Sequence, residues 1–185
     1  SRPMINKITG ISMAFPSYTD TMRNAFLSYQ IFDFIAIFCP FYPTPQKIVA
    51  QKPKTVSSKE EFEVIKTHCM QGANMLRRLE NFEDEPLLQT AYEIARWHHE
   101  RWDGRGYPDG LKGNDIPISA QIVSLADVYD ALTSERCYKK AFSHETAMRM
   151  ILNGECGAFN PLLLECLTDI QAELQEKSQN ITVNR

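Results

Sequence analysis

Histidine is scarce in this chain, with only four residues, at positions 68, 98, 99 and 144. Any metal site must therefore use very few imidazole ligands. The five cysteines are odd in number and scattered, and they form no C-x-x-C pair. This pattern argues against a disulfide framework and against a zinc ribbon. It fits a reducing compartment, so we expect a cytoplasmic protein.

Long apolar runs are also missing. The longest covers residues 31–41, is interrupted by Asp33 and Pro40, and is too short to span a bilayer. The net charge of −3 gives no general attraction to a nucleic-acid polymer or an anionic membrane. With 43% apolar and 23% charged residues, the composition is that of a globular protein, and 185 residues predict a single domain over 1–185.

Helical periodicity dominates from residue 58 onward, with no convincing period-2 strand and no internal repeat. The second predicted helix should reach about residue 102, and the polar tail after residue 177 is expected to fray. Caps or first-turn prolines mark the starts of five helices, at Ser58, Pro86, Pro117, Ser143 and Asn160. The sequence therefore predicts an all-α fold.

Glycine is concentrated in one place. Four of the eight glycines fall between residues 104 and 113, in the string DGRGYPDGLKG. Such a run requires a loop whose backbone turns sharply, either to approach a ligand closely or simply to connect two helices.

Three predicted helices each direct an imidazole or a carboxylate toward a shared interior. His68 lies on the inward face of the first, and His98 continues the apolar stripe of the second with His99 at its edge. Asp127 and Asp130 flank the apolar face of the third. Each has an ordinary explanation alone, as a hydrogen-bonded core histidine, a cap partner or a surface charge. Together they favour a Zn, Mn or Fe site.

The long string at residues 98–140, HHERWDGRGYPDGLKGNDIPISAQIVSLADVYDALTSERCYKK, resembles the signature half of the HD-GYP family. These are metal-dependent phosphodiesterases of bacterial cyclic di-GMP signalling. KTHCMQGANML at 66–76 and GAFNP at 157–161 extend the resemblance over about residues 45–170. The resemblance implies an HD-type helical bundle with a glycine-rich loop between helices. It leaves a divergent part at 1–45 and a recognisable core at 46–175.

Matched position by position, the resemblance implies three sets of functional residues. The metal ligands would be His68, His98, His99 and Asp127. The loop that shapes the substrate pocket and contacts partner domains would comprise Asp103, Gly104, Gly106, Tyr107 and Pro108. The cations that bind the substrate's phosphates would be Arg136 and Lys139.

The part upstream of the core departs from the family. Its namesake is an adjacent His-Asp pair followed by Gly-Lys, but no histidine precedes His68 in this sequence. One alignment keeps Asp33 as a candidate catalytic residue, whereas an ungapped alignment places Ile37 and Phe38 at the pair. Four ligands then remain, which suit one Fe, Mn or Zn ion. They are too few for two ions about 3.5–4 Å apart.

Three hypotheses remain at this point. The first is a degenerate HD-GYP domain that binds a cyclic dinucleotide such as cyclic di-GMP, or docks other signalling proteins through the GYP loop, with crippled hydrolysis. The second is an active phosphodiesterase that hydrolyses cyclic di-GMP with a metal-bound hydroxide. The third is a helical interaction or homodimerisation domain without a ligand.

Overall fold

The computed structural model describes residues 59–79, 83–135 and 140–183. These residues form helices and loops, and no strand occurs in the described ranges, which confirms the all-α prediction. The helices are α4 (Lys59–Leu76), α5 (Pro86–Trp97), α6 (Ile118–Thr133), α7 (His144–Leu152) and α8 (Pro161–Val183), with a 3₁₀ turn at Gly113–Asp115.

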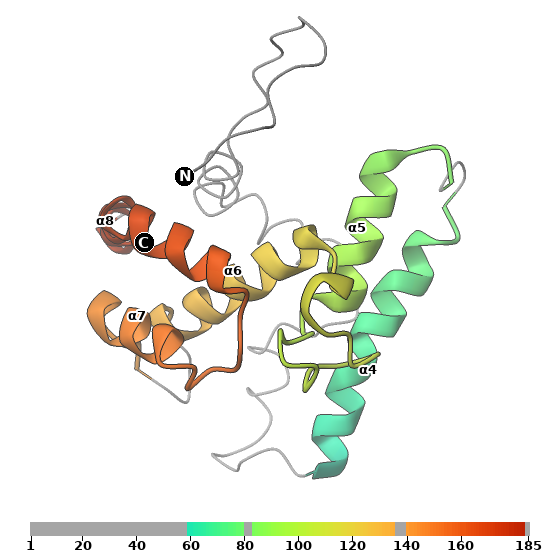
Figure 1. The fold of residues 1–185 in the computed structure, drawn as a ribbon, viewed down its shortest axis with the longest axis horizontal. Helices are drawn as coiled ribbons and strands as arrows, with labels where there is room; N and C mark the ends of the chain where they lie inside the picture. The colour runs from blue at the N-terminus through green and yellow to red at the C-terminus, as the bar shows by residue number, and fades with distance from the viewer. Residues whose placement is uncertain (1–58, 80–82, 136–139, 184–185) are drawn as a thin grey trace, which may run out of the picture.

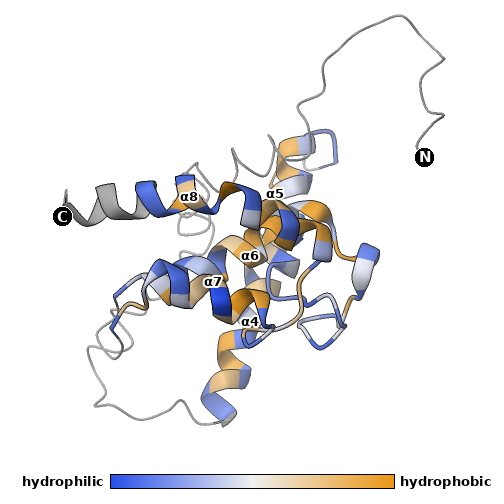
Figure 2. Ribbon diagram, turned by 60° about the vertical axis from the view of Figure 1, so that its left-hand side comes forward, coloured by the Kyte–Doolittle hydropathy of each residue, from blue (hydrophilic) through white to orange (hydrophobic). Residues whose placement is uncertain are grey.

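The helix α6 occupies the centre of the described structure, with α4 and α5 on one side and α7 and α8 on the other (Figure 1). Every residue from Ala120 to Ala126 is buried. A helix that is buried on all sides must lie between layers rather than on a surface. Apolar colouring along α6 in Figure 2 agrees with this position.

One apolar cluster joins α6 to the C-terminal helices. Leu125, Ile151, Leu163 and Leu167 are each 0% exposed within it. Leu163 and Leu167 are four residues apart on α8, so they lie on the same face of that helix. This cluster fixes α7 and α8 against the central helix.

The predicted starts of the last two helices are confirmed by their hydrogen bonds. Ser143 Oγ accepts a hydrogen bond from Thr146 N at 3.3 Å, and Asn160 Oδ1 accepts one from Leu162 N at 3.0 Å. Asn160 also donates to Gln121 Oε1 at 2.9 Å. The cap of α8 is therefore tied to α6 as well. The helix continues to Val183, so the expected fraying after residue 177 is wrong for the backbone.

The second helix ends earlier than predicted. α5 stops at Trp97, and His98 is its C-cap. Glu100 N donates to Trp97 O at 2.9 Å in a tighter turn, which breaks the α-helical ladder. His99 therefore lies just beyond the helix rather than on its edge, because the chain is already entering the glycine-rich loop.

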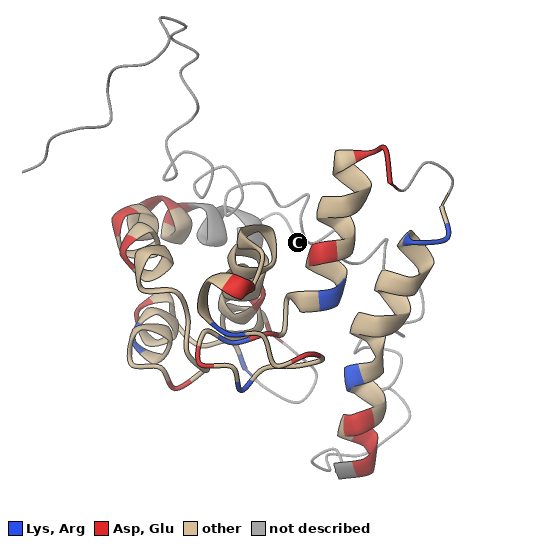
Figure 3. Ribbon diagram, turned by 45° about the vertical axis from the view of Figure 1, so that its right-hand side comes forward, with Lys and Arg blue, Asp and Glu red and all other residues tan. Residues whose placement is uncertain are grey.

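Charges of both signs lie on α4 and on the glycine-rich loop (Figure 3). The loop segment 103–113 contains two acidic and two basic residues, Asp103, Asp109, Arg105 and Lys112. None of the described helices is long and apolar enough to cross a bilayer.

The neighbouring residues Leu162 and Leu163 provide a matched test of the core. Leu163 is fully buried, whereas Leu162 is 50% exposed. We expect Leu163→Ala to lower the free energy of unfolding by about 2–5 kcal/mol, because it leaves a cavity. Leu162→Ala should cost no more than about 0.5 kcal/mol. Urea denaturation followed by circular dichroism measures both, and equal losses would contradict this core.

Candidate metal centre

Three imidazoles converge where α4 meets the end of α5. His68 projects from α4, and His98 and His99 follow one another at the end of α5. The Nε2 atoms of His68 and His98 are 3.2 Å apart. The His99 ring centroid lies 4.1 Å from that of His98 and 5.0 Å from that of His68. The structure thus brings together three of the four residues predicted to bind metal.

The hydrogen bonds of the two facing rings determine which nitrogens are available. His68 Nδ1 is 2.6 Å from Ile65 O, and His98 Nδ1 is 2.8 Å from Ile94 O. A carbonyl oxygen only accepts, so each Nδ1 must carry the hydrogen. In the neutral rings, both Nε2 atoms then present lone pairs to each other. A cation between them would relieve this repulsion, and a carbonyl on the other ring nitrogen is the usual support for a ligating histidine.

Burial keeps these rings neutral. Loss of solvent around His98, helped by the nearby His68, lowers the pKa of His98 to about 4. Burial also lowers the pKa of His68, although the hydrogen bond to Ile65 O partly offsets this effect. The pKa of His99 falls as well, first through burial and then through the neighbouring His98. Neutral imidazole is the form that binds metal ions.

The fourth donor of the cluster is Cys69 rather than Asp127. One ligand atom from each of His68, Cys69, His98 and His99 lies within 4.8 Å of the others. Asp127 is half-buried on α6 and does not belong to this group. Its carboxylate instead lies close enough to Arg101 to offset part of the fall in the Arg101 pKa that burial causes. The chemistry of the four donors fits one divalent cation.

The glycine-rich loop packs directly on the histidine segment. A Cβ at Gly106 would lie 2.3 Å from Glu100 Cα and 2.4 Å from Arg101 N, so only glycine fits there. Gly104 has a φ of +81°, which also favours glycine. This close contact lets the Tyr107 ring lie 4.8 Å from the His99 ring, tilted by 30°.

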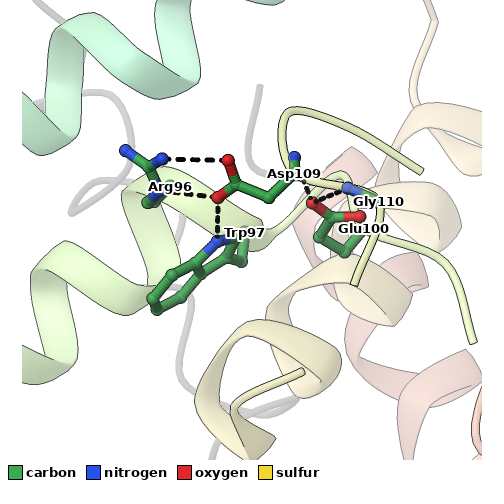
Figure 4. Close-up of polar contacts among 5 residues, drawn as sticks. All are labelled: Arg96, Trp97, Glu100, Asp109 and Gly110. Atoms are coloured by element: carbon green, nitrogen blue, oxygen red, sulfur yellow. Dashed lines mark hydrogen bonds and ion pairs between the residues drawn. The ribbon is translucent and has the colours of Figure 1, made fainter. Parts of the chain in front are cut away.

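Two carboxylates hold the far side of the loop in place (Figure 4). Asp109 accepts two hydrogen bonds from Arg96, at 2.7 and 2.9 Å, and one from Trp97 Nε1 at 2.7 Å. Glu100 Oε1 accepts from the backbone nitrogens of Asp109 and Gly110, at 2.8 and 3.0 Å. Glu100 is only 2% exposed, and these bonds satisfy Oε1, whereas the buried Oε2 has no hydrogen-bond partner among the described residues. The loop is thus fixed to both ends of the segment 96–100.

The sequence model of the HD domain family matches residues 41–157 of this chain. The chain belongs to the HD domain family. Relatives include a "Probable cyclic di-GMP phosphodiesterase" of Vibrio cholerae, 45% identical over 57% of this chain and 24% of that protein. A "Cyclic di-GMP phosphodiesterase" of the same organism is 38% identical over 85% of this chain and 32% of its own length. These matches support the HD-GYP assignment made from the sequence.

A "Cyclic di-GMP phosphodiesterase" of Thermotoga maritima is 40% identical over 65% of this chain and 32% of its own length. The chain therefore spans about a quarter to a third of the length of these relatives. A solved Vibrio cholerae phosphodiesterase specific for cyclic GMP-AMP has a TM-score of 0.46 at 19% identity, covering 89% of this chain and 41% of its own.

The remaining predicted site residues divide into two groups. The catalytic candidate Asp33 and the two phosphate-binding candidates Arg136 and Lys139 lie outside the described residues. The HD domain match begins at residue 41, so it too leaves out Asp33. Asp103 is exposed and accepts a hydrogen bond from Arg105 N at 3.0 Å, which shapes the loop locally. Pro108 follows Tyr107 in a cis peptide bond.

Sequence analysis missed three residues that organise this site. In the sequence, Cys69 has the spacing of an apolar residue on the first predicted helix, although it directly follows His68. The buried Glu100 was quoted in the HHE string without a role. Arg101 donates to Ser124 Oγ at 2.6 Å and lies 5.4 Å from the Phe159 ring, so it joins the site to α6 and to the start of α8. Only the structure reveals that contact.

Gly106→Ala tests the close packing of the loop. The added methyl group would collide with the backbone of Glu100 and Arg101, so the loop must move and Tyr107 must leave His99. We expect a loss of about 1–3 kcal/mol in the free energy of unfolding and altered Tyr107 and His99 signals in nuclear magnetic resonance spectra.

The control is Gly113→Asn in the same loop. Gly113 has a φ of +58°, which asparagine tolerates, and nothing lies within 4 Å of its added Cβ. This variant should leave the Tyr107 and His99 signals in place. If Gly106→Ala also leaves them in place, the described packing is wrong.

Proposed function

We propose that this chain is a degenerate HD-GYP domain that binds one divalent metal ion and a cyclic dinucleotide of the cyclic di-GMP type, with little or no hydrolysis. The observation that carries the proposal is the composition of the centre. Its donor cluster contains three histidines and a cysteine and leaves out Asp127, and no histidine precedes His68 in the sequence. The names of the relatives supply the substrate class.

Within this proposal the histidines hold the ion and the loop holds the nucleotide. A bound divalent cation would supply positive charge close to the phosphates of a nucleotide bound to the loop. His68 and His98 are already oriented for ligation by their bonds to backbone carbonyls. Two metal ions, which an in-line displacement of this kind needs, require more ligands than these donors provide.

An aromatic and cationic surface beside the centre supports nucleotide binding. The Phe62 ring is 46% exposed and meets Tyr107 edge-on, with the ring centroids 6.3 Å apart. Lys66 Nζ lies 5.0 Å from the Phe62 ring and 5.6 Å from the Tyr107 ring, and it forms an ion pair with Glu63 Oε1 at 2.7 Å, which a phosphate would have to displace. Rings of this kind stack on bases, and an ammonium group attracts phosphate. Arg136 and Lys139 would add further phosphate contacts.

Metal content and turnover, measured on the same sample, test the proposal. We expect about one metal ion per chain by elemental analysis. We also expect no hydrolysis of cyclic di-GMP above background after addition of Mn²⁺ or Fe²⁺. Two ions per chain with efficient turnover would instead establish an active phosphodiesterase and make the degenerate interpretation wrong.

The histidines supply the matched control for this experiment. His99→Ala removes a donor of the cluster and should weaken metal binding more than about 100-fold, because losing only a supporting partner already costs about 10–100-fold. His144 hydrogen-bonds with Tyr129 on the other side of α6, at 2.9 Å. His144→Ala should therefore leave metal binding unchanged.

Arg136→Ala tests the nucleotide half of the proposal. Removing a guanidinium that binds phosphate should weaken cyclic di-GMP binding about tenfold or more, because a charge-assisted hydrogen bond contributes about 1.5–3 kcal/mol. Isothermal titration calorimetry measures the change, with Arg149→Ala on the exposed surface of α7 as a control. Unchanged binding, or no binding by the unmodified chain, would favour a helical interaction domain without a ligand.

A further inference from the structure

Cys69 brings a different chemistry to the metal centre. It follows His68 directly on α4 and is 0% exposed. Its Sγ lies 3.5 Å from His68 Nε2, and it is one of four donors that lie within 4.8 Å of one another. The ligand set implied by the family resemblance has Asp127 as its fourth member and contains no cysteine. The thiol is therefore an additional donor beside three imidazoles.

Two distances between the donor atoms match the edges of a tetrahedral zinc site. Zn–N bonds of about 2.0–2.1 Å and a Zn–S bond of about 2.3 Å place two nitrogens about 3.3 Å apart and a nitrogen about 3.6 Å from the sulfur. The distance between the Nε2 atoms of His68 and His98 is 3.2 Å, and that between His68 Nε2 and Cys69 Sγ is 3.5 Å. The remaining donor pairs lie within 4.8 Å of one another, so some of these donors must move closer together to accept the ion.

We propose that Cys69 binds the ion as a thiolate and completes a closed tetrahedral zinc site with His68, His98 and His99. The inference rests on the proposed function, since both place one ion between the same imidazoles. It goes further by filling the position that a catalytic zinc site keeps open for water or substrate. A thiolate also selects zinc over manganese, which prefers oxygen ligands.

The binding step is balanced without any redox change. The Cys69 S–H bond breaks and its proton passes to the buffer, while a sulfur lone pair forms the Zn–S bond. The three imidazoles donate nitrogen lone pairs. With four protein ligands, the ion has no exchangeable position, and hydrolysis is lost even where a nucleotide still binds to the loop.

The test begins with the unmodified chain loaded with Zn²⁺ alone. X-ray absorption at the zinc edge should show one sulfur neighbour at about 2.3 Å and three nitrogens at about 2.0–2.1 Å. The chain loaded with Co²⁺ should show a thiolate-to-cobalt charge-transfer band. Zinc surrounded only by nitrogen and oxygen would overturn the proposal. This measurement needs no variant, so a folding defect cannot obscure it.

Matched cysteine variants add a second readout. Cys69→Ala should abolish the charge-transfer band and weaken zinc binding more than about 100-fold. Cys166 is also buried, at 3% exposure, but it lies in the cluster between α6, α7 and α8. Cys166→Ala should retain the band and the affinity. A band that survives in Cys69→Ala would overturn the proposal.

The outcomes separate this inference from the function on which it rests. A single ion bound without sulfur overturns Cys69 ligation and leaves the one-metal, non-hydrolysing interpretation standing. Sulfur ligation together with rapid cyclic di-GMP hydrolysis overturns the proposed function and the closure of the site, although the Zn–Sγ bond remains. A chain that binds one ion of another divalent metal but no zinc overturns only the ligation by Cys69, whereas a chain that binds no divalent metal overturns both proposals.

Discussion

The pair of hydrogen bonds from His68 Nδ1 and His98 Nδ1 to backbone carbonyls is the constraint on which the centre depends. Each bond fixes a ring to its own helix, one turn back toward the N-terminus. The opposite nitrogens of the two rings consequently face each other across the junction of α4 and α5. The fold thus holds two lone pairs in close opposition, and a cation between them would relieve that repulsion.

The glycine-rich loop depends on the same segment. Gly106 rests on the backbone of residues 100 and 101, and Tyr107 lies against His99. Glu100 and Asp109 then fix the return of the loop through bonds to backbone nitrogens and to Arg96. Any shift of the histidine segment would therefore displace the aromatic surface proposed for the nucleotide. The positions of the histidine cluster and of the loop are therefore coupled.

Much of this arrangement could be predicted from local sequence. Caps at Ser143 and Asn160, and prolines at the starts of α5 and α8, act within one turn, so they locate helices correctly. The early end of α5 could not be predicted, because the stop comes from a loop that packs back on it. Cys69 was overlooked for a related reason. On a helical wheel it reads as an apolar core residue, and only the approach of His98 and His99 from another helix makes its sulfur a donor. Asp127 lies on the predicted helix but outside the group of four donors, and its carboxylate offsets part of the fall in the Arg101 pKa that burial causes.

A metal centre that holds only one ion can still stabilise the domain. An ion that binds only the folded state stabilises it by about 2.7 kcal/mol at a concentration one hundred times the dissociation constant. That free energy would act at the junction of α4 and α5, where the three imidazoles lie together. Since the loop is fixed to this junction, the same free energy would hold Tyr107 and its neighbours in position for a ligand. Hydrolysis and binding therefore make separable demands on the site. Hydrolysis needs an open coordination position and a second ion, whereas binding needs only that the helices and the loop keep their relative positions.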